Sequence, residues 1–400
     1  MRIRNFTFLL LIIAFVVTSI QSAFSIPAFA RKYQMSCSTC HAPAPKLKAF
    51  GDEFAGNGFV MEGKEPKRAT IDTGDPLLLL QRELPLALRF DAYAQFQPDA
   101  KGEDVKDDLQ TPYVLKILSG GQVYKSVSYY FYFFFSERGE VAGIEDAYLH
   151  FNNLLGVPFD IMLGQFQVSD PLFKRELRLT FEDYQIYRAR VGDVPANLTY
   201  DRGLMLTYTA PFGSDFVGQI VNGNGIDPAR ENRQFDEDGY KNFALRWTHE
   251  FPIVRLGLFG MYGKSQNLDN KNKSELVYYG PDATVNAGPF EINLQYLWRE
   301  DDNPFYRINK PVDKVKTDGG LAEVVFSPQG QDGRWFLIGL YNKVSSNVLE
   351  INPEAASPKY ESAGLTATYL IGRNLRLMGE YTYDIENERS RFVVGFVSAF

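Results

Sequence analysis

Residues 84–97 read LPLALRFDAYAQFQ and alternate between apolar and polar side chains. One face carries Leu84, Leu86, Leu88, Phe90, Ala92, Ala94 and Phe96. The other carries Pro85, Ala87, Arg89, Asp91, Tyr93, Gln95 and Gln97. A repeat of two residues is typical of a β-strand, and the stretch is long enough to cross a bilayer at a tilt. An apolar face and a polar face together suit a barrel with lipid outside and water inside.

The same alternation recurs along the chain, for example in residues 290–299 and 375–384. It predicts strands at 84–97, 111–119, 122–136, 143–152, 158–168, 198–210, 214–222, 241–251, 253–264, 275–286, 289–299, 318–327, 333–345, 358–371, 373–385 and 389–400. We therefore predict an all-β fold for residues 83–400, a transmembrane antiparallel β-barrel of about 16 strands. A soluble β-sandwich is the alternative.

The predicted connections alternate in length. Short ones fall at Gly120-Gly121, 211–213 and 371–372. Long ones fall at 98–110, 169–197, 223–240, 300–317 and 346–357. Bacterial outer-membrane barrels have short periplasmic turns and long extracellular loops. We expect 169–197, the longest loop, to fold into the lumen.

The net charge limits the possible partners of the chain, and its first residues indicate its location. The net charge of −7 and the pI of about 5.3 argue against a nucleic-acid partner. Arg2 and Arg4 precede an apolar stretch at 8–17 and small residues up to Ser25, the pattern of a signal peptide over residues 1–25. We predict cleavage after Ser25, export, and residence in the outer-membrane lipid of a Gram-negative-type bacterium.

Residues 37–41 read CSTCH and contain both cysteines of the chain. This spacing is the attachment pattern of c-type haem. Cys37 and Cys40 would bind one haem c covalently through its vinyl groups, and His41 would be the proximal iron ligand. A redox-active cysteine pair, a structural disulfide and a zinc site are the alternatives. Zinc sites usually have four ligands, and the motif supplies three.

The distal iron ligand has several candidates. Met61 follows the motif by twenty residues, and methionine ligation raises a haem potential. His150 is predicted to face the lumen, and Met35 precedes the motif. An open distal position would permit reactions with small ligands.

The whole plan, a haem-binding segment at 26–82 followed by a barrel, resembles the fused monohaem c-type cytochrome–porins of the bacterial outer membrane. The matching residues are Ala28-Phe29-Ala30-Arg31, Cys37-Ser38-Thr39-Cys40-His41, Pro45, Leu47, Ala49-Phe50-Gly51, Phe54 and Gly58-Phe59. The resemblance implies a cytochrome segment that plugs the lumen or lies on its periplasmic side, and oxidation of extracellular Fe(II). Iron-oxidising members carry aromatic residues directly after the haem histidine, whereas this chain has Ala42-Pro43-Ala44-Pro45-Lys46.

The sequence thus predicts an electron carrier that transfers electrons across the outer membrane, an Fe(II):cytochrome-type oxidoreductase if iron is the donor. One haem is too small to span a hydrocarbon core of about 30 Å, so we expect a periplasmic cytochrome or another soluble redox carrier as partner. The alternatives are a solute porin with a haem-bearing plug as gate or sensor, and a peroxidase-like haem enzyme. A homotrimer is a further expectation, since many porins are trimers.

Overall fold

The computed structural model describes residues 28–61, 64, 70–99, 106–230, 232–236, 238–311 and 313–400. The predicted signal peptide lies outside the described residues. The described residues begin with three helices, α2 (Ala28–Tyr33), α3 (Cys37–Cys40) and α4 (Ala49–Gly56), followed by a small sheet of β1 (Thr70–Ile71) and β2 (Leu80–Gln81).

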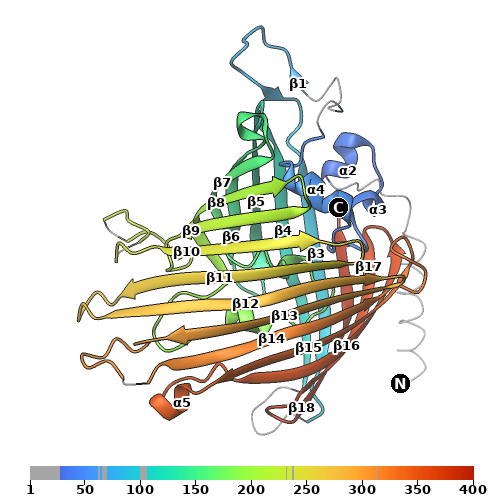
Figure 1. The fold of residues 1–400 in the computed structure, drawn as a ribbon. Coiled ribbons are helices and arrows are strands. Elements are labelled where there is room, and N and C mark those ends of the chain that lie inside the picture. Colours follow the sequence, from blue (N-terminus) through green and yellow to red (C-terminus); the bar gives the residue numbers. More distant parts are fainter. Residues whose placement is uncertain are drawn as a thin grey trace, which may run out of the picture.

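In the described part of the chain, sixteen strands form one closed antiparallel barrel, as predicted (Figure 1). They are β3 (Leu86–Phe96), β4 (Asp107–Tyr124), β5 (Val127–Glu137), β6 (Gly143–Phe151), β7 (Phe159–Gln167), β8 (Tyr200–Ala210), β9 (Ser214–Val221), β10 (Asn242–Glu250), β11 (Val254–Gln266), β12 (Lys273–Ala287), β13 (Phe290–Asp301), β14 (Val315–Phe326), β15 (Trp335–Ser346), β16 (Tyr360–Gly372), β17 (Leu375–Asp384) and β18 (Arg389–Ala399). The last strand pairs with the first, Phe392 opposite Phe96 through Ala399 opposite Arg89, and this pairing closes the barrel.

The predicted alternation of faces is confirmed, and β13 shows it clearly. Leu294, Tyr296 and Trp298 are exposed on the outer surface, where lipid would lie. Asn293, Gln295 and Arg299 alternate with them and are buried inside the barrel. No helix within the described ranges is long and apolar enough to cross a membrane.

The five predicted long connections all lie at one end of the barrel, although three further connections at that end are short (138–142, 267–272 and 385–388). One predicted turn is wrong. Gly120 and Gly121 lie within β4, and the chain reverses instead at Lys125 and Ser126. A Cβ at Gly120 would approach Phe29, Phe59 and Tyr130, with ring carbons at 3.1 Å. The glycine therefore makes room for aromatic rings of the N-terminal segment. The turn predicted at 371–372 is displaced to residues 373–374.

The loop of residues 168–199 folds into the lumen, as expected. It contains two short 3₁₀ helices, η2 (Arg175–Leu177) and η3 (Gln185–Arg188). Its apolar side chains form a buried cluster with inward residues of the wall. The Tyr184 hydroxyl donates to Glu323 at 2.9 Å, and the Tyr187 hydroxyl donates to Gln295 at 3.0 Å. The loop is thus fixed to the opposite wall by packing and by hydrogen bonds.

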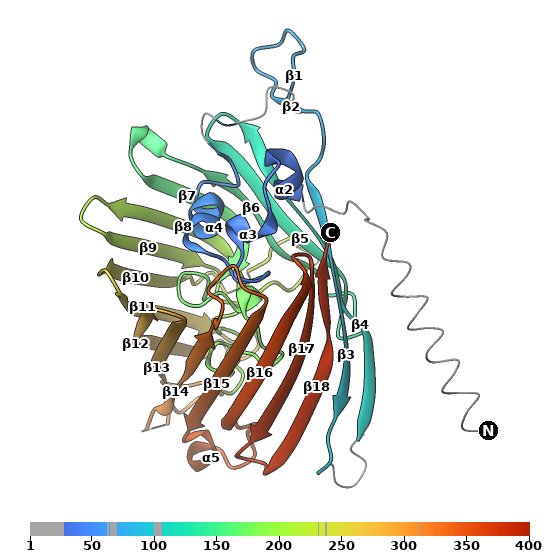
Figure 2. The ribbon, with the colours of Figure 1, turned by 90° about the vertical axis from the view of Figure 1, so that its right-hand side faces the viewer.

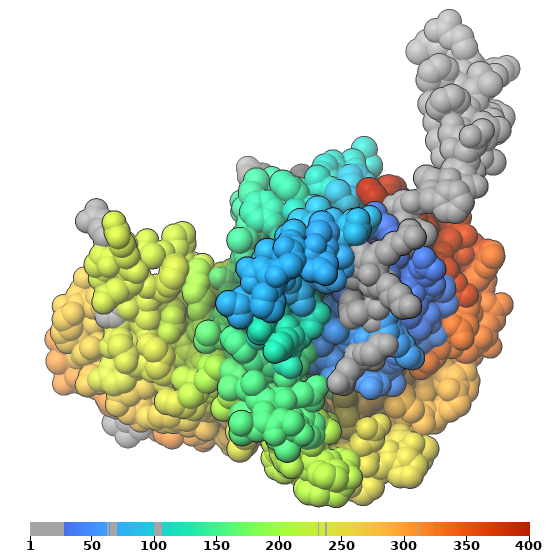
Figure 3. All heavy atoms as spheres, turned by 90° about the horizontal axis from the view of Figure 1, so that it is seen from above, coloured from blue at the N-terminus to red at the C-terminus, as the bar shows by residue number. Residues whose placement is uncertain are grey.

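The helices α2, α3 and α4 lie in the mouth at the short-turn end, near the C-terminus (Figure 2). Seen from above the view of Figure 1, the blue atoms of the N-terminal part lie between green and orange atoms, which belong to parts of the chain far apart in the sequence (Figure 3). We call residues 28–61 the plug segment. Short turns of outer-membrane barrels face the periplasm.

We predict that Gly120→Leu displaces the plug segment while the barrel still folds, because the added side chain would overlap Phe29 and Phe59. Overpacking of this kind costs about 1–3 kcal/mol. Limited proteolysis should cut within residues 28–61 faster than in the wild type. Gly339→Leu is the matched control, since a Cβ there has no neighbour within 4 Å. Equal cleavage of both variants would contradict the packing argument, and heat-modifiable gel migration checks barrel folding.

Candidate functional site

The short helix α3 brings the two cysteines to one face of a single turn. Ser36 caps the helix, its hydroxyl accepting from the Ser38 N–H at 3.3 Å. Side chains three residues apart in a helix are neighbours, so Cys37 and Cys40 lie next to each other. Both are free thiols and are partly exposed. Burial raises the pKa of each thiol, so both groups are protonated at neutral pH.

His41 follows directly and is held in one orientation. Its backbone N–H donates to the Cys37 carbonyl at 2.9 Å. Its ring Nδ1 lies 3.2 Å from the Pro45 carbonyl oxygen and 3.3 Å from that of Lys46. Carbonyls accept only, so Nδ1 carries the proton and Nε2 keeps its lone pair. Burial lowers the pKa of His41, which favours the neutral imidazole.

Gly51 lets α4 pack closely on α3. A Cβ at this position would lie 2.4 Å from the Cys40 carbonyl oxygen and 3.0 Å from a methyl of Leu47. The Lys48 N–H donates to the same carbonyl at 2.8 Å. Close packing of α4 on the CSTCH turn therefore requires a glycine at position 51.

An aromatic cluster joins the plug segment to the wall. Phe29 stacks on Phe59 with ring centroids 4.9 Å apart, and Phe54 meets both rings edge to face. Phe59 in turn stacks on Tyr130 of β5 at 4.7 Å. The Tyr33 hydroxyl donates to the Phe59 carbonyl at 3.4 Å. Stacked rings of this kind contribute roughly 0.5–1.5 kcal/mol per pair beyond area burial.

Ion pairs hold the other side of the plug segment. Lys46 pairs with Glu291 of β13, and both side chains are largely buried. Lys48 pairs with Asp332, in the turn before β15, at 2.7 Å. Nothing in the sequence pattern pointed to these partners, since they lie more than 240 residues away.

The distal-ligand candidates lie in different places. Met61 ends the plug segment, and its N–H donates to the Tyr33 hydroxyl at 3.2 Å, next to α2. Met35 lies between α2 and α3, its N–H donating to Ala30. His150 is buried on β6, and its Nε2 lies 3.6 Å from Asp160. The contact of Met61 is thus with a helix of the plug segment, whereas the contact of His150 is with another residue of the barrel wall.

The residues present fit a covalent haem c. Two free thiols on one helical face match the two vinyl groups, and a neutral imidazole with its Nδ1 already hydrogen-bonded matches an axial ligand. Hydrogen bonding of the second ring nitrogen fixes the tautomer and orientation of a metal-binding histidine. Cys37, Cys40 and His41 are therefore the residues that could hold a haem c.

The fold is that of porin-like outer-membrane barrels. The structure is similar to the anion-selective porin from Comamonas acidovorans, at 10% identity and a TM-score of 0.57 over 80% of this chain and 99% of the other. It is similar to the outer-membrane channel DcaP of Acinetobacter baumannii, at 12% identity and a TM-score of 0.56 over 80% and 97%. It is also similar to a loop L8 deletion mutant of OmpT, an outer-membrane protein of Vibrio cholerae. The identity is 12% and the TM-score is 0.55, over 80% of this chain and 99% of the other. No protein-family model and no curated protein matches the sequence.

We predict that Gly51→Ala loosens the haem motif, because its methyl group would overlap the Cys40 carbonyl. The cost should be about 1–3 kcal/mol of local stability. Hydrogen exchange of amides in residues 37–56 should accelerate. Gly56→Ala, on the same helix with open space around the new Cβ, is the control and should leave exchange unchanged or slow it. Faster exchange in the Gly56 variant alone would refute this account of the motif.

Proposed function

We propose that this chain is an outer-membrane electron carrier that holds one haem c in the periplasmic mouth of a porin-like barrel. The observation that carries the proposal is the CSTCH helix packed inside the short-turn end, with His41 Nδ1 engaged and both thiols free. When bound, the haem supplies a one-electron couple. Cys37 and Cys40 would add their S–H groups across its vinyl groups, and His41 Nε2 would bind the iron.

The residues around the motif would fix the position of the redox centre. Stacking of Phe59 on Tyr130, and the Lys46–Glu291 and Lys48–Asp332 pairs, hold the plug segment from two sides of the wall. Electron transfer depends steeply on distance, so a fixed position favours transfer to one partner surface. We propose that this partner is a periplasmic cytochrome or another soluble redox carrier.

The donor in this proposal is extracellular Fe(II), which the resemblance to fused cytochrome–porins implies. The plug segment and loop 168–199 both lie inside the barrel. A lumen filled in this way favours the role of an electron carrier over that of an open pore. The porin-like fold supports residence in the outer membrane. A solute porin with a haem-bearing plug is the second candidate, supported by likeness to channel and porin structures. A homotrimer is also proposed, since one similar OmpT structure is described as a trimer form.

The test is a redox titration of the purified full chain in detergent, with absorption spectra before and after Fe(II) is added. We predict one covalent haem that Fe(II) reduces, and loss of covalent haem in Cys37→Ala/Cys40→Ala. A haem that only a periplasmic cytochrome reduces would reverse the direction of transfer. Protein without haem absorbance would refute the carrier and leave the porin, which conductance in planar bilayers would detect.

Replacing Met61 tests the distal ligand. We predict that Met61→Ala lowers the midpoint potential by on the order of 0.1 V, since axial ligands set haem potentials over a range of about 0.8 V. The matched control is Met35→Ala, which should leave the potential in place. A shift in the Met35 variant instead would assign the ligand there, and no shift in either would exclude both methionines.

A further inference from the structure

One side chain of the plug segment, that of Lys46, links the haem motif to the barrel wall. Its ammonium group pairs with the Glu291 carboxylate at the start of β13, and the two side chains are only 18% and 20% exposed. Solvent and salt screen a partly buried pair much less than a surface pair. The pair therefore fixes Lys46 relative to the strand.

The backbone of the same lysine accepts from the proposed iron ligand. His41 Nδ1 lies 3.3 Å from the Lys46 carbonyl oxygen and 3.2 Å from that of Pro45. The Lys46 carbonyl also accepts from the Ala42 N–H at 2.9 Å, which closes the turn of residues 42–46. The side chain that binds the wall and a carbonyl that orients the imidazole thus belong to one residue.

Hydrogen bonds from neighbouring strands hold Glu291 in turn. The Asn293 amide donates to Glu291 at 2.9 Å and to Glu323 of β14 at 3.0 Å. The Thr284 hydroxyl of β12 donates to Asn293 Oδ1 at 3.0 Å. Glu323 also accepts from the Tyr184 hydroxyl, on the loop inside the lumen, at 2.9 Å. One polar network thus runs from that loop across the wall to the plug segment.

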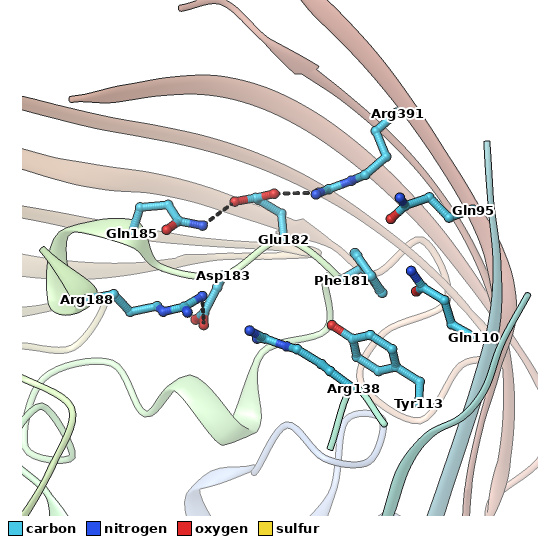
Figure 4. Close-up of a pocket in the computed structure, with 10 residues that line it drawn as sticks. All are labelled: Gln95, Gln110, Tyr113, Arg138, Phe181, Glu182, Asp183, Gln185, Arg188 and Arg391. Carbon is cyan, nitrogen blue, oxygen red and sulfur yellow. Dashed lines mark hydrogen bonds and ion pairs between the residues drawn. The ribbon is translucent and has the colours of Figure 1, made fainter. Parts of the chain in front are cut away.

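The loop end of this network is also fixed, because the residues on both sides of Tyr184 are tied to the wall. Glu182 pairs with Arg391 of β18, and the Gln185 amide donates to Glu182 at 2.7 Å (Figure 4). The Gln185 backbone N–H donates to Asn342 of β15 at 3.3 Å. With its neighbours held in this way, the carboxylate that pairs with the plug segment has a defined position.

We propose that Glu291 of the barrel wall is a positioning residue for the redox centre: through Lys46 it holds the carbonyl groups that accept from His41 Nδ1. This inference rests on the proposed function and deepens it, since it assigns the tuning of the centre to the wall as well as to the plug segment. Hydrogen bonding of the second ring nitrogen raises the basicity of a histidine ligand. A more basic ligand favours the oxidised metal, so the intact pair lowers the midpoint potential.

The first experiment measures midpoint potentials of the full chain in detergent. Lys46→Met/Glu291→Gln removes one positive and one negative charge from the same pair, so their direct effects on the redox centre nearly cancel. We expect the potential to rise, because the turn of residues 42–46 loosens and its carbonyls hold His41 Nδ1 less firmly. Lys46→Arg keeps the charge and the donor groups and should keep the wild-type potential.

The matched control is Lys314→Met/Glu300→Gln, which removes a lysine–glutamate pair of 2.9 Å at the other end of the same strand. It should leave the midpoint potential unchanged. An unchanged potential in Lys46→Met/Glu291→Gln, or an equal rise in the control, would overturn the proposal. A rise in Glu291→Gln alone, with none in the double variant, would show that only charge acts and would overturn it as well.

Hydrogen exchange without haem separates this inference from the electron carrier. In a Cys37→Ala/Cys40→Ala background, Lys46→Met/Glu291→Gln should speed amide exchange in residues 42–47, and the control pair should not. Faster exchange there would leave the link between Glu291 and the turn standing even if the haem assignment fails. Unchanged exchange would show that Glu291 does not hold the turn and would overturn the inference whether or not haem binds. Heat-modifiable gel migration shows whether each variant keeps its barrel.

Discussion

Every backbone N–H and C=O group that crosses lipid must be paired within the protein, and this constraint determines the structure. A sheet satisfies it only when its first and last strands meet. Here β18 pairs with β3, and the terminal Phe400 exchanges backbone hydrogen bonds with Leu88. A barrel of this strand number encloses a lumen wider than wall side chains alone can fill. The contents of the lumen therefore decide what the protein can do.

Two segments of the described chain occupy the lumen, and each is fixed by a different set of interactions. The plug segment packs through aromatic rings and two ion pairs at the short-turn end. Loop 168–199 packs through an apolar cluster and polar contacts to the wall. Arg299 illustrates the polar contacts: its guanidinium bonds Asp301, the Tyr278 hydroxyl and the carbonyls of Ala189 and Ala196. A buried charge is tolerated when all its donors are paired. The plug segment and loop 168–199 thus fill the lumen from opposite ends of the barrel.

The fold could be predicted from local patterns, because the alternation of side chains in each strand, and hence the number of strands, can be read from neighbouring residues. The turn predicted at Gly120-Gly121 was wrong for a physical reason. Two consecutive glycines usually indicate a reversal. In this chain Gly120 makes room for Phe29 and Phe59, which lie far away in the sequence. The spacing of the CSTCH motif is also local, so the prediction of a haem site rests on neighbouring residues alone.

The rest of the candidate site depended on long-range contacts. Glu291 and Asp332 meet the plug segment only after the barrel closes. The contacts of loop 168–199 with Gln295 and Glu323 likewise form only in the folded barrel, and no spacing rule connects these residues.

The pairing that closes the barrel has a consequence for how the protein folds. Ser398 donates to the Phe90 carbonyl across a separation of 308 residues. Contacts of such high order form late and slowly, because the entropy of closing the intervening chain is lost before the contact stabilises anything. Arg31 of the plug segment donates to Leu86 beside that junction. The plug segment therefore contacts the wall next to this late-forming junction, so its docking site and the last step of barrel closure meet at the same place in the structure.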